Sequence, residues 1–331
     1  MRDYPCSRSP SGVALLILSM LLLGGYEVAI GQVKSDDPPT DAETTPEDQA
    51  TDETPEAESE PEKPGAPDKQ PRRRIFKRIG PQPMTAEERE EAERLRKIAA
   101  KYGTDPTAIV GRLQLTSQYF DLPQSVQATT STLRVDLPFR GNYLLRMDLP
   151  FLKTTDPDSP GMPNNRGLSD LSVIAGWRAY NTPEYALLVG ALGTFPTASE
   201  TPLGFGKYTV GPAVATARFL PRLDSFLIGL LQYQASVGGD PSRKDVSLFT
   251  VTAQVNSFWG QGWWTVFQSV WHVDFERSGK SSMVMEFEGG KNLIGRLGAY
   301  VRPGVGIYGR DVIGAYIWNI EIGVRYMFTS F

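Results

Sequence analysis

The stretch YIWNIEIGVRYMF, residues 316–328, decides the fold because large apolar side chains occupy every second position. The apolar positions are Tyr316, Trp318, Ile320, Ile322, Val324, Tyr326 and Phe328, and the positions between them include Asn319, Glu321 and Arg325. Successive side chains of a strand point to opposite faces. The stretch therefore predicts a long strand with one apolar face and one polar face.

The same alternation recurs through the chain from about residue 110, for example in 141–149 and 262–275. Turn signals divide this region into about twelve segments of about ten to fourteen residues. The segments begin near residues 110, 125, 141, 168, 184, 206, 224, 245, 262, 281, 294 and 312. Strands of this length suit a tilted crossing of a bilayer better than an average soluble sheet.

The connections between these segments also alternate in length. Those on the side of the N-terminus are short, whereas several on the other side are longer and polar, notably 153–167, 196–206 and 237–244. Long loops on one side, short turns on the other and an even strand number are typical of outer-membrane barrels. We therefore predict an all-β fold over 104–331, a transmembrane antiparallel up-and-down β-barrel of about twelve strands, with both termini in the periplasm.

A soluble β-sandwich would also alternate, but two features favour the membrane barrel. All six tryptophans lie in this region, several near segment ends, as in an aromatic girdle. They are Trp177, Trp259, Trp263, Trp264, Trp271 and Trp318. The last strand also ends in aromatic residues, and Tyr326, Phe328 and Phe331 form an expected signal for the outer-membrane assembly machinery. Phe331 has the parity of Arg325, so this signal requires a bulge or frayed end.

Residues 1–31 are expected to be a cleaved signal peptide. Arg2 and Arg8 precede an apolar run over 13–23, and small residues lead to a cleavage point after Gly31. The run reaches about 17 Å as a helix, which is too short for a bilayer core of about 30 Å, so a membrane anchor is the weaker alternative. The only cysteine, Cys6, precedes the run and is lost with the signal.

Charge separates the remaining N-terminal residues from the barrel. Residues 32–71 hold 13 acids and 3 bases, whereas 104–331 hold 18 acids and 19 bases. Such a Pro-rich acidic segment cannot bury enough apolar surface to fold, so 32–83 is predicted to be a disordered linker. Its basic cluster, 72–78, could contact anionic lipid or the cell wall, although a solvated charge run is the simpler interpretation.

Residues 84–103 are predicted to form a short periplasmic helix. Thr85 and Glu88 fit a capping box, and Gly103 supplies the stop. Ala92, Leu95, Ala99 and Tyr102 recur at helical spacing and form a narrow apolar stripe. Such a stripe needs a partner surface. A plug, a strut against the barrel and a coiled-coil seam between copies all remain open.

Two successive segments carry a family resemblance. GLSDLSVIAGWR at 167–178 and ALLVGALGTFPT at 186–197 resemble a Gram-negative outer-membrane family, the putative transporters of the meta-pathway of phenol degradation. The family has glycine where this chain has Ser169 and Ala198. The resemblance covers about 110–331. It implies a channel-like barrel with a role in the uptake of hydrophobic or aromatic compounds.

If the large apolar side chains face lipid, the opposite parity lines the lumen. The predicted lumen-lining residues are Arg134, Asp136, Arg146, Asp148, Arg178, Gln268, His272, Asp274, Glu286, Glu288, Arg296, Arg302, Glu321 and Arg325. Both signs of charge occur in similar numbers. The side chains can therefore pair across the lumen, and no ring of one sign predicts strong ion selectivity.

The sequence favours a channel over an enzyme. His272 is the single histidine, Ser269 lies on the opposite face by parity, and Asp274 would orient the imidazole without a placed serine. The sequence shows no cofactor, metal or nucleic-acid-binding motif. We expect a channel in the outer membrane of a Gram-negative-type bacterium, in contact with lipid and a small-molecule solute. The alternative is a structural barrel anchored to the cell wall through 32–103.

Overall fold

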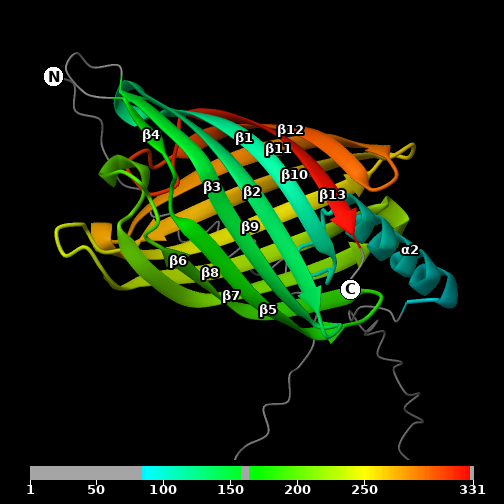
Figure 1. Ribbon diagram of the computed structural model, residues 1–331. Coiled ribbons are helices and arrows are strands. Elements are labelled where there is room, and N and C mark those ends of the chain that lie inside the picture. The colour runs from blue at the N-terminus through cyan, green and yellow to red at the C-terminus, as the bar shows by residue number, and fades with distance from the viewer. Residues whose placement is uncertain (1–83, 158–163, 329–331) are drawn as a thin grey trace, which may run out of the picture. The chain divides into compact units, whose positions relative to one another are not determined.

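The computed structural model describes residues 84–157 and 164–328 of the chain (Figure 1). The predicted signal peptide, the linker and Phe331 lie outside the described residues. Over those two ranges, no helix has both the length and the apolar character needed to cross a membrane.

Twelve long strands form a closed antiparallel barrel. They are β1 (Gly111–Leu122), β2 (Val126–Phe139), β3 (Tyr143–Pro157), β5 (Leu171–Asn181), β6 (Tyr185–Phe195), β7 (Lys207–Leu220), β8 (Ser225–Gly239), β9 (Ser247–Phe258), β10 (Trp263–Asp274), β11 (Lys280–Ile294), β12 (Leu297–Tyr308) and β13 (Trp318–Phe328). Each pairs with its neighbours in the chain, and β1 pairs with both β2 and β13, which closes the ring. The short strand β4 (Asn165–Gly167) pairs with β3. The predicted twelve-stranded up-and-down barrel is confirmed.

The two ends of the barrel differ in their connections. Short turns at 140–142, 182–184, 221–224, 259–262 and 295–296 lie at one end, which we call the short-turn end. The other end, called the loop end, carries the long connections 196–206 and 309–317. The helix α2 (Ala86–Tyr102) lies at the short-turn end (Figure 1).

Side chains alternate along the strands as the sequence predicts. On β13, Ile322 is 56% exposed on the outer face whereas Arg325 is 4% exposed on the inner face. Large apolar side chains therefore cover the outside of the barrel. Trp264 departs from the predicted aromatic girdle because it shares the inward parity of Gln268 and is 1% exposed.

The last strand begins later than predicted. Sequence alternation suggested a strand from about residue 312 with Tyr316 on the outer face. In the structure β13 begins at Trp318, and Tyr316 is buried with its hydroxyl donating to Glu286. Gly309 and Gly314 adopt left-handed backbone conformations, which end the extended run between β12 and β13.

The helix has both predicted caps. The Thr85 hydroxyl accepts a hydrogen bond from the Glu88 amide at 3.2 Å, and the Glu88 carboxylate accepts one from the Thr85 amide at 3.0 Å. Gly103 ends the helix in the left-handed conformation, with φ of 66°. These contacts fix both ends of α2 locally.

The apolar stripe of α2 packs against the barrel itself. Ala92, Leu95 and Ala99 are fully buried in a cluster with inward-facing residues of β6, β7 and β8, including Phe219 and Phe226. Burying a leucine side chain contributes about 1.5–3 kcal/mol, so the cluster holds the helix on the inner wall. The stripe is therefore occupied within one chain, as both the plug and the strut alternatives require.

Polar contacts tie α2 to the short turns. Arg94 pairs with Asp224 of the turn between β7 and β8, at 2.6 Å. Arg96 donates to the Thr182 carbonyl of the turn between β5 and β6. The helix is thus fixed to two turns at the short-turn end as well as to the inner wall.

Candidate functional site

The barrel encloses a cavity of about 380 Å³. The segment after α2, residues 103–107, forms its floor, where Gly103, Thr104 and Pro106 line the cavity. Arg325 of β13 donates a hydrogen bond to the Gly103 carbonyl at 3.0 Å and so fixes this segment to the wall. The cavity is therefore bounded at the short-turn end by the residues that follow the helix.

Salt bridges between neighbouring strands form one part of the cavity wall. Arg134 of β2 and Asp148 of β3 make a bidentate pair at 2.5 and 3.0 Å. Arg146 makes a second bidentate pair with Asp136, at 2.8 and 3.1 Å, and Arg112 of β1 also approaches Asp136, at 3.1 Å. Two-point contacts of this kind fix the planes of both groups, so this part of the wall is rigid.

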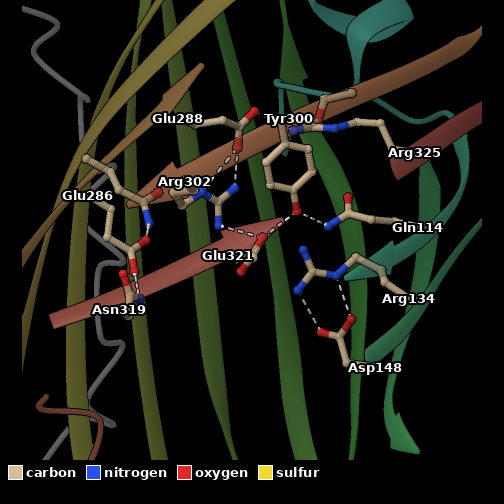
Figure 2. A network of polar contacts seen from close by, with 12 residues as sticks. Gln114, Arg134, Asp148, Glu286, Glu288, Tyr300, Arg302, Asn319, Glu321 and Arg325 are labelled. Carbon is tan, nitrogen blue, oxygen red and sulfur yellow. Dashed lines mark hydrogen bonds and ion pairs between the residues drawn. The ribbon is translucent and has the colours of Figure 1, made fainter. Parts of the chain in front are cut away.

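Glu288 of β11 is the centre of a second network (Figure 2). This carboxylate is 1% exposed and accepts hydrogen bonds from Arg302 and Arg325. It also accepts a hydrogen bond from the Trp264 indole at 2.6 Å. Because a buried carboxylate requires charged partners, Glu288 and its two arginines depend on each other for stability.

Arg325 is also held by aromatic faces. Its guanidinium carbon lies 4.3 Å from the centroid of Tyr300 and 5.1 Å from that of Trp264. Tyr102, the last residue of α2, stacks on Trp264 with ring centroids 5.4 Å apart. The end of the helix is thereby connected to the Glu288 network.

Glu286 and Glu321 continue the polar wall toward the loop end. Glu286 accepts hydrogen bonds from the Tyr316 hydroxyl at 2.7 Å and the Asn319 amide at 2.8 Å. Glu321 accepts from the Tyr300 hydroxyl and lies 3.4 Å from the Arg302 guanidinium (Figure 2). Glu286 thus has neutral donors, whereas Glu321 has an arginine partner.

The other half of the wall, from β5 to β10, is mainly apolar. Its lining includes Leu188, Ala215, Ile228 and Val266. Among the described residues that line the cavity, those from β5 to β10 are all uncharged, and the charged ones come from β1 to β3 and β11 to β13. The cavity therefore has one charged half and one uncharged half. We call the second the apolar half, and its polar lining residues are Ser172, Gln232, Thr252, Gln254, Asn256 and Gln268.

The structure brings most of the predicted lumen-lining residues into contact with other polar side chains of the inner wall. Those joined by direct contacts are Arg134, Asp136, Arg146, Asp148, Gln268, Glu286, Glu288, Arg302, Glu321 and Arg325. Arg178, His272 and Asp274 lie apart from them, near the barrel ends. Arg178 bonds to the turn at Gly141, His272 lies 3.1 Å from Thr250, and Asp274 accepts from the Glu276 amide.

Arg296 is not on the inner wall as predicted. It lies exposed in the turn between β11 and β12. By alternation Arg296 would point to the same side as Arg302. However, β12 begins only at Leu297, and alternation does not predict the direction of a side chain in a turn. The prediction for Arg296 was wrong for this reason.

Sequence reasoning missed several cavity residues. Arg112, Gln114 and Asn256 line the cavity, and Trp264 and Tyr300 support it. Arg112 and Gln114 alternate with Leu113 and Leu115, so parity could have identified them. The roles of the two aromatic residues could not be identified in that way, because aromatic residues were expected on the outer face.

Asp105 in the cavity floor is a buried carboxylate whose burial raises its pKa above the ordinary value of 3.8. Its Oδ1 accepts hydrogen bonds from the Thr107 amide and hydroxyl, at 2.8 and 2.6 Å. Because the pKa is higher in the folded state, protonated Asp105 stabilises the fold, and this stabilisation is complete below pH 3.8. The stabilisation is lost as the pH rises through the pKa of the folded state.

Asp105→Asn is therefore expected to raise the urea midpoint of unfolding at pH 7, because the neutral amide avoids the cost of burying a charge. The difference from the wild type should shrink as the pH falls toward 4, near the ordinary value of 3.8. Unfolding curves from pH 3 to pH 8 measure both effects. A constant difference at every pH would show that charge is not the cause.

Solved structures with the same architecture include outer-membrane channels. The COG4313 outer membrane channel from Pseudomonas putida F1 is 12% identical with a TM-score of 0.50, over 68% of this chain and 97% of that one. The NanC porin is 14% identical with a TM-score of 0.48, over 65% and 98%. The KdgM porin in complex with disordered oligogalacturonate is 10% identical with a TM-score of 0.44, over 66% and 99%.

The similarity to the P. putida channel shows the fold of this chain. No protein-family model matches the sequence. No curated protein matches it significantly. The cavity and its lining must therefore carry the functional argument.

Proposed function

We propose that this protein is an outer-membrane channel through which small solutes, hydrophobic or aromatic ones among them, pass along the barrel interior. The observation that carries the proposal is a cavity inside a closed barrel whose outer face is apolar. A closed barrel leaves no sheet edge, which is what permits strands to cross a bilayer. The fold shared with a P. putida channel supports this use of the barrel.

Exposed aromatic side chains near both ends of the strands support a membrane location. Tyr143 and Trp263 lie at the short-turn end, and Tyr208 and Trp318 lie at the loop end, each at least 42% exposed. Aromatic rings concentrate at the two membrane–water interfaces. We place the short-turn end and α2 in the periplasm, and we propose Tyr326 and Phe328 as contacts for the assembly machinery.

The apolar half of the cavity supports an aromatic or hydrophobic solute, as the family resemblance implies. A solute that reaches this half can pack its carbon surface against Leu188, Ile228 and Val266. The floor formed by residues 103–107 would then control release into the periplasm. In this proposal α2 is a plug that must shift when a solute passes.

We assign the barrel no catalytic role. The Asp274 carboxylate accepts from a turn amide and approaches Arg277 at 3.4 Å, and the His272 imidazole contacts Thr250. The Thr250 hydroxyl and the imidazole have the spacing of a nucleophile and its base, but the contacts of Asp274 go to the turn and not to the imidazole that it would have to orient. The periplasmic arm, cell-wall contact through 32–103 and the structural alternative stay predictions.

The proposal is tested by planar-bilayer recordings of the purified wild-type chain. We expect discrete conductance steps with a preference for anions, because five arginines and two carboxylates line the cavity. A heat-modifiable shift on unboiled gels checks that the inserted protein is the folded barrel. Folded protein that gives no conductance steps and passes no solute would exclude a channel.

A further inference from the structure

We propose that the cavity binds small organic carboxylates, with the carboxylate on the arginine half and an apolar or aromatic body on the opposite half. This inference rests on the proposed channel function and names its substrate class. The cavity of about 380 Å³ has the size of a small-ligand site. Its two unlike halves face the same space.

The charged half presents more positive than negative groups to that space. Five arginines line the cavity, and Asp148 and Glu288 are the carboxylates among its described lining residues. The arginines are Arg112, Arg134, Arg146, Arg302 and Arg325. Asp136 and Glu321 pair with some of them without lining the cavity. A solute therefore meets an excess of guanidinium donors.

Arg112 makes the fewest hydrogen bonds of these five arginines in the described part of the chain. It is 6% exposed, and its Nε is 3.1 Å from Asp136 in a geometry that makes no hydrogen bond. Among the described residues, its guanidinium makes one hydrogen bond, from Nη1 to Gln114 at 3.5 Å. Guanidinium carries five N–H donors and binds carboxylates at two points. Arg112 is thus the best placed donor for an incoming carboxylate.

Asn256 supplies a second unsatisfied group on the cavity wall. It lines the cavity from β9, is 1% exposed, and neither its amide nitrogen nor its amide oxygen has a hydrogen-bond partner in the described part of the chain. A buried amide without partners is costly. A bound polar group would satisfy it, while neighbouring Ile228 and Val266 contact the ligand's carbon surface.

Calorimetric titration of the folded full-length protein in detergent, at constant ionic strength, tests the site with three probes. Benzoate has both a carboxylate and an aromatic body, benzyl alcohol keeps the body, and acetate keeps the charge. We expect benzoate to bind at least about tenfold more tightly than either of the other probes. Benzyl alcohol lacks the charge-assisted hydrogen bonds of the carboxylate, and acetate lacks the apolar surface of the ring. Equal affinity for benzoate and benzyl alcohol, or for benzoate and acetate, would overturn the proposal.

Two cavity variants and one control locate the site. Arg112→Gln should weaken benzoate binding about tenfold and leave benzyl alcohol unchanged, because it removes a charged donor. Ala215→Leu fills the apolar half and should weaken both aromatic probes, which keeps the test decisive if Arg112→Gln does not fold. Arg140→Gln, on an exposed arginine in the turn between β2 and β3, should change neither. Unchanged benzoate binding in a folded cavity variant would overturn the assignment.

Binding and conduction are separate measurements. If the protein conducts but does not prefer benzoate, the carboxylate inference fails and the channel proposal stands. If it prefers benzoate but neither conducts nor passes solute, the channel proposal fails and the cavity remains a carboxylate site.

Discussion

Glu288→Gln is expected to lower the melting temperature of the barrel by about 10 °C. Glu288 is 1% exposed and neutralises Arg302 and Arg325. Glutamine keeps the shape but leaves Arg325 without its carboxylate partner and Arg302 with Glu321 alone, which costs about 3–5 kcal/mol. The temperature at which the compact form disappears from unboiled gels measures the change.

Glu286→Gln is the matched control on the same strand. Glu286 is 8% exposed, and its side-chain partners are the neutral donors Tyr316, Asn319 and Gln268. Glutamine keeps one oxygen that accepts from Tyr316 and Asn319, loses the acceptor of Gln268, and leaves no guanidinium without its partner. The melting temperature should therefore fall much less. Equal losses for the two variants would show that the salt bridges of Glu288 are not the cause.

Leu95→Glu is expected to release α2 from the barrel wall and to raise the conductance severalfold. Leu95 is fully buried beside Phe219 and Phe226. Truncating a buried leucine already costs about 2–5 kcal/mol, and a buried carboxylate adds a desolvation penalty. Because α2 leads directly into the floor at 103–107, release of the helix should open the short-turn end of the cavity. Planar-bilayer recordings measure the step size.

Lys97→Glu controls for the introduced charge because Lys97 is exposed on the same helix. It should leave the conductance near the wild-type value. If Leu95→Glu conducts like the wild type while the barrel stays folded, α2 is not the plug, and the floor at 103–107 does not depend on its docking.

The barrel could be predicted from sequence because one physical rule covers most of it. A strand crossing a bilayer must be apolar on one face, so period-two alternation reported both the strands and their inward faces. Arg134 and Asp148 were placed on the lumen side by parity alone, and the antiparallel register makes them direct neighbours. The same rule would have identified Arg112.

The rule fails where the chain leaves the strand. Arg296 lies in a turn, and Tyr316 lies in the connection before β13, so parity assigns neither side chain correctly. The docking of α2 was also beyond sequence reasoning. Its stripe shows that a partner surface exists, but the partner residues, such as Ala217 and Ile228, come from strands more than a hundred residues away.

Swelling of liposomes that contain the folded protein tests most directly whether solutes pass through the barrel interior. With a small aromatic solute outside, wild-type liposomes should swell faster than empty ones, and liposomes with Leu95→Glu should swell faster still. Swelling no faster than that of empty liposomes, for both chains and with barrel insertion verified, would contradict the channel.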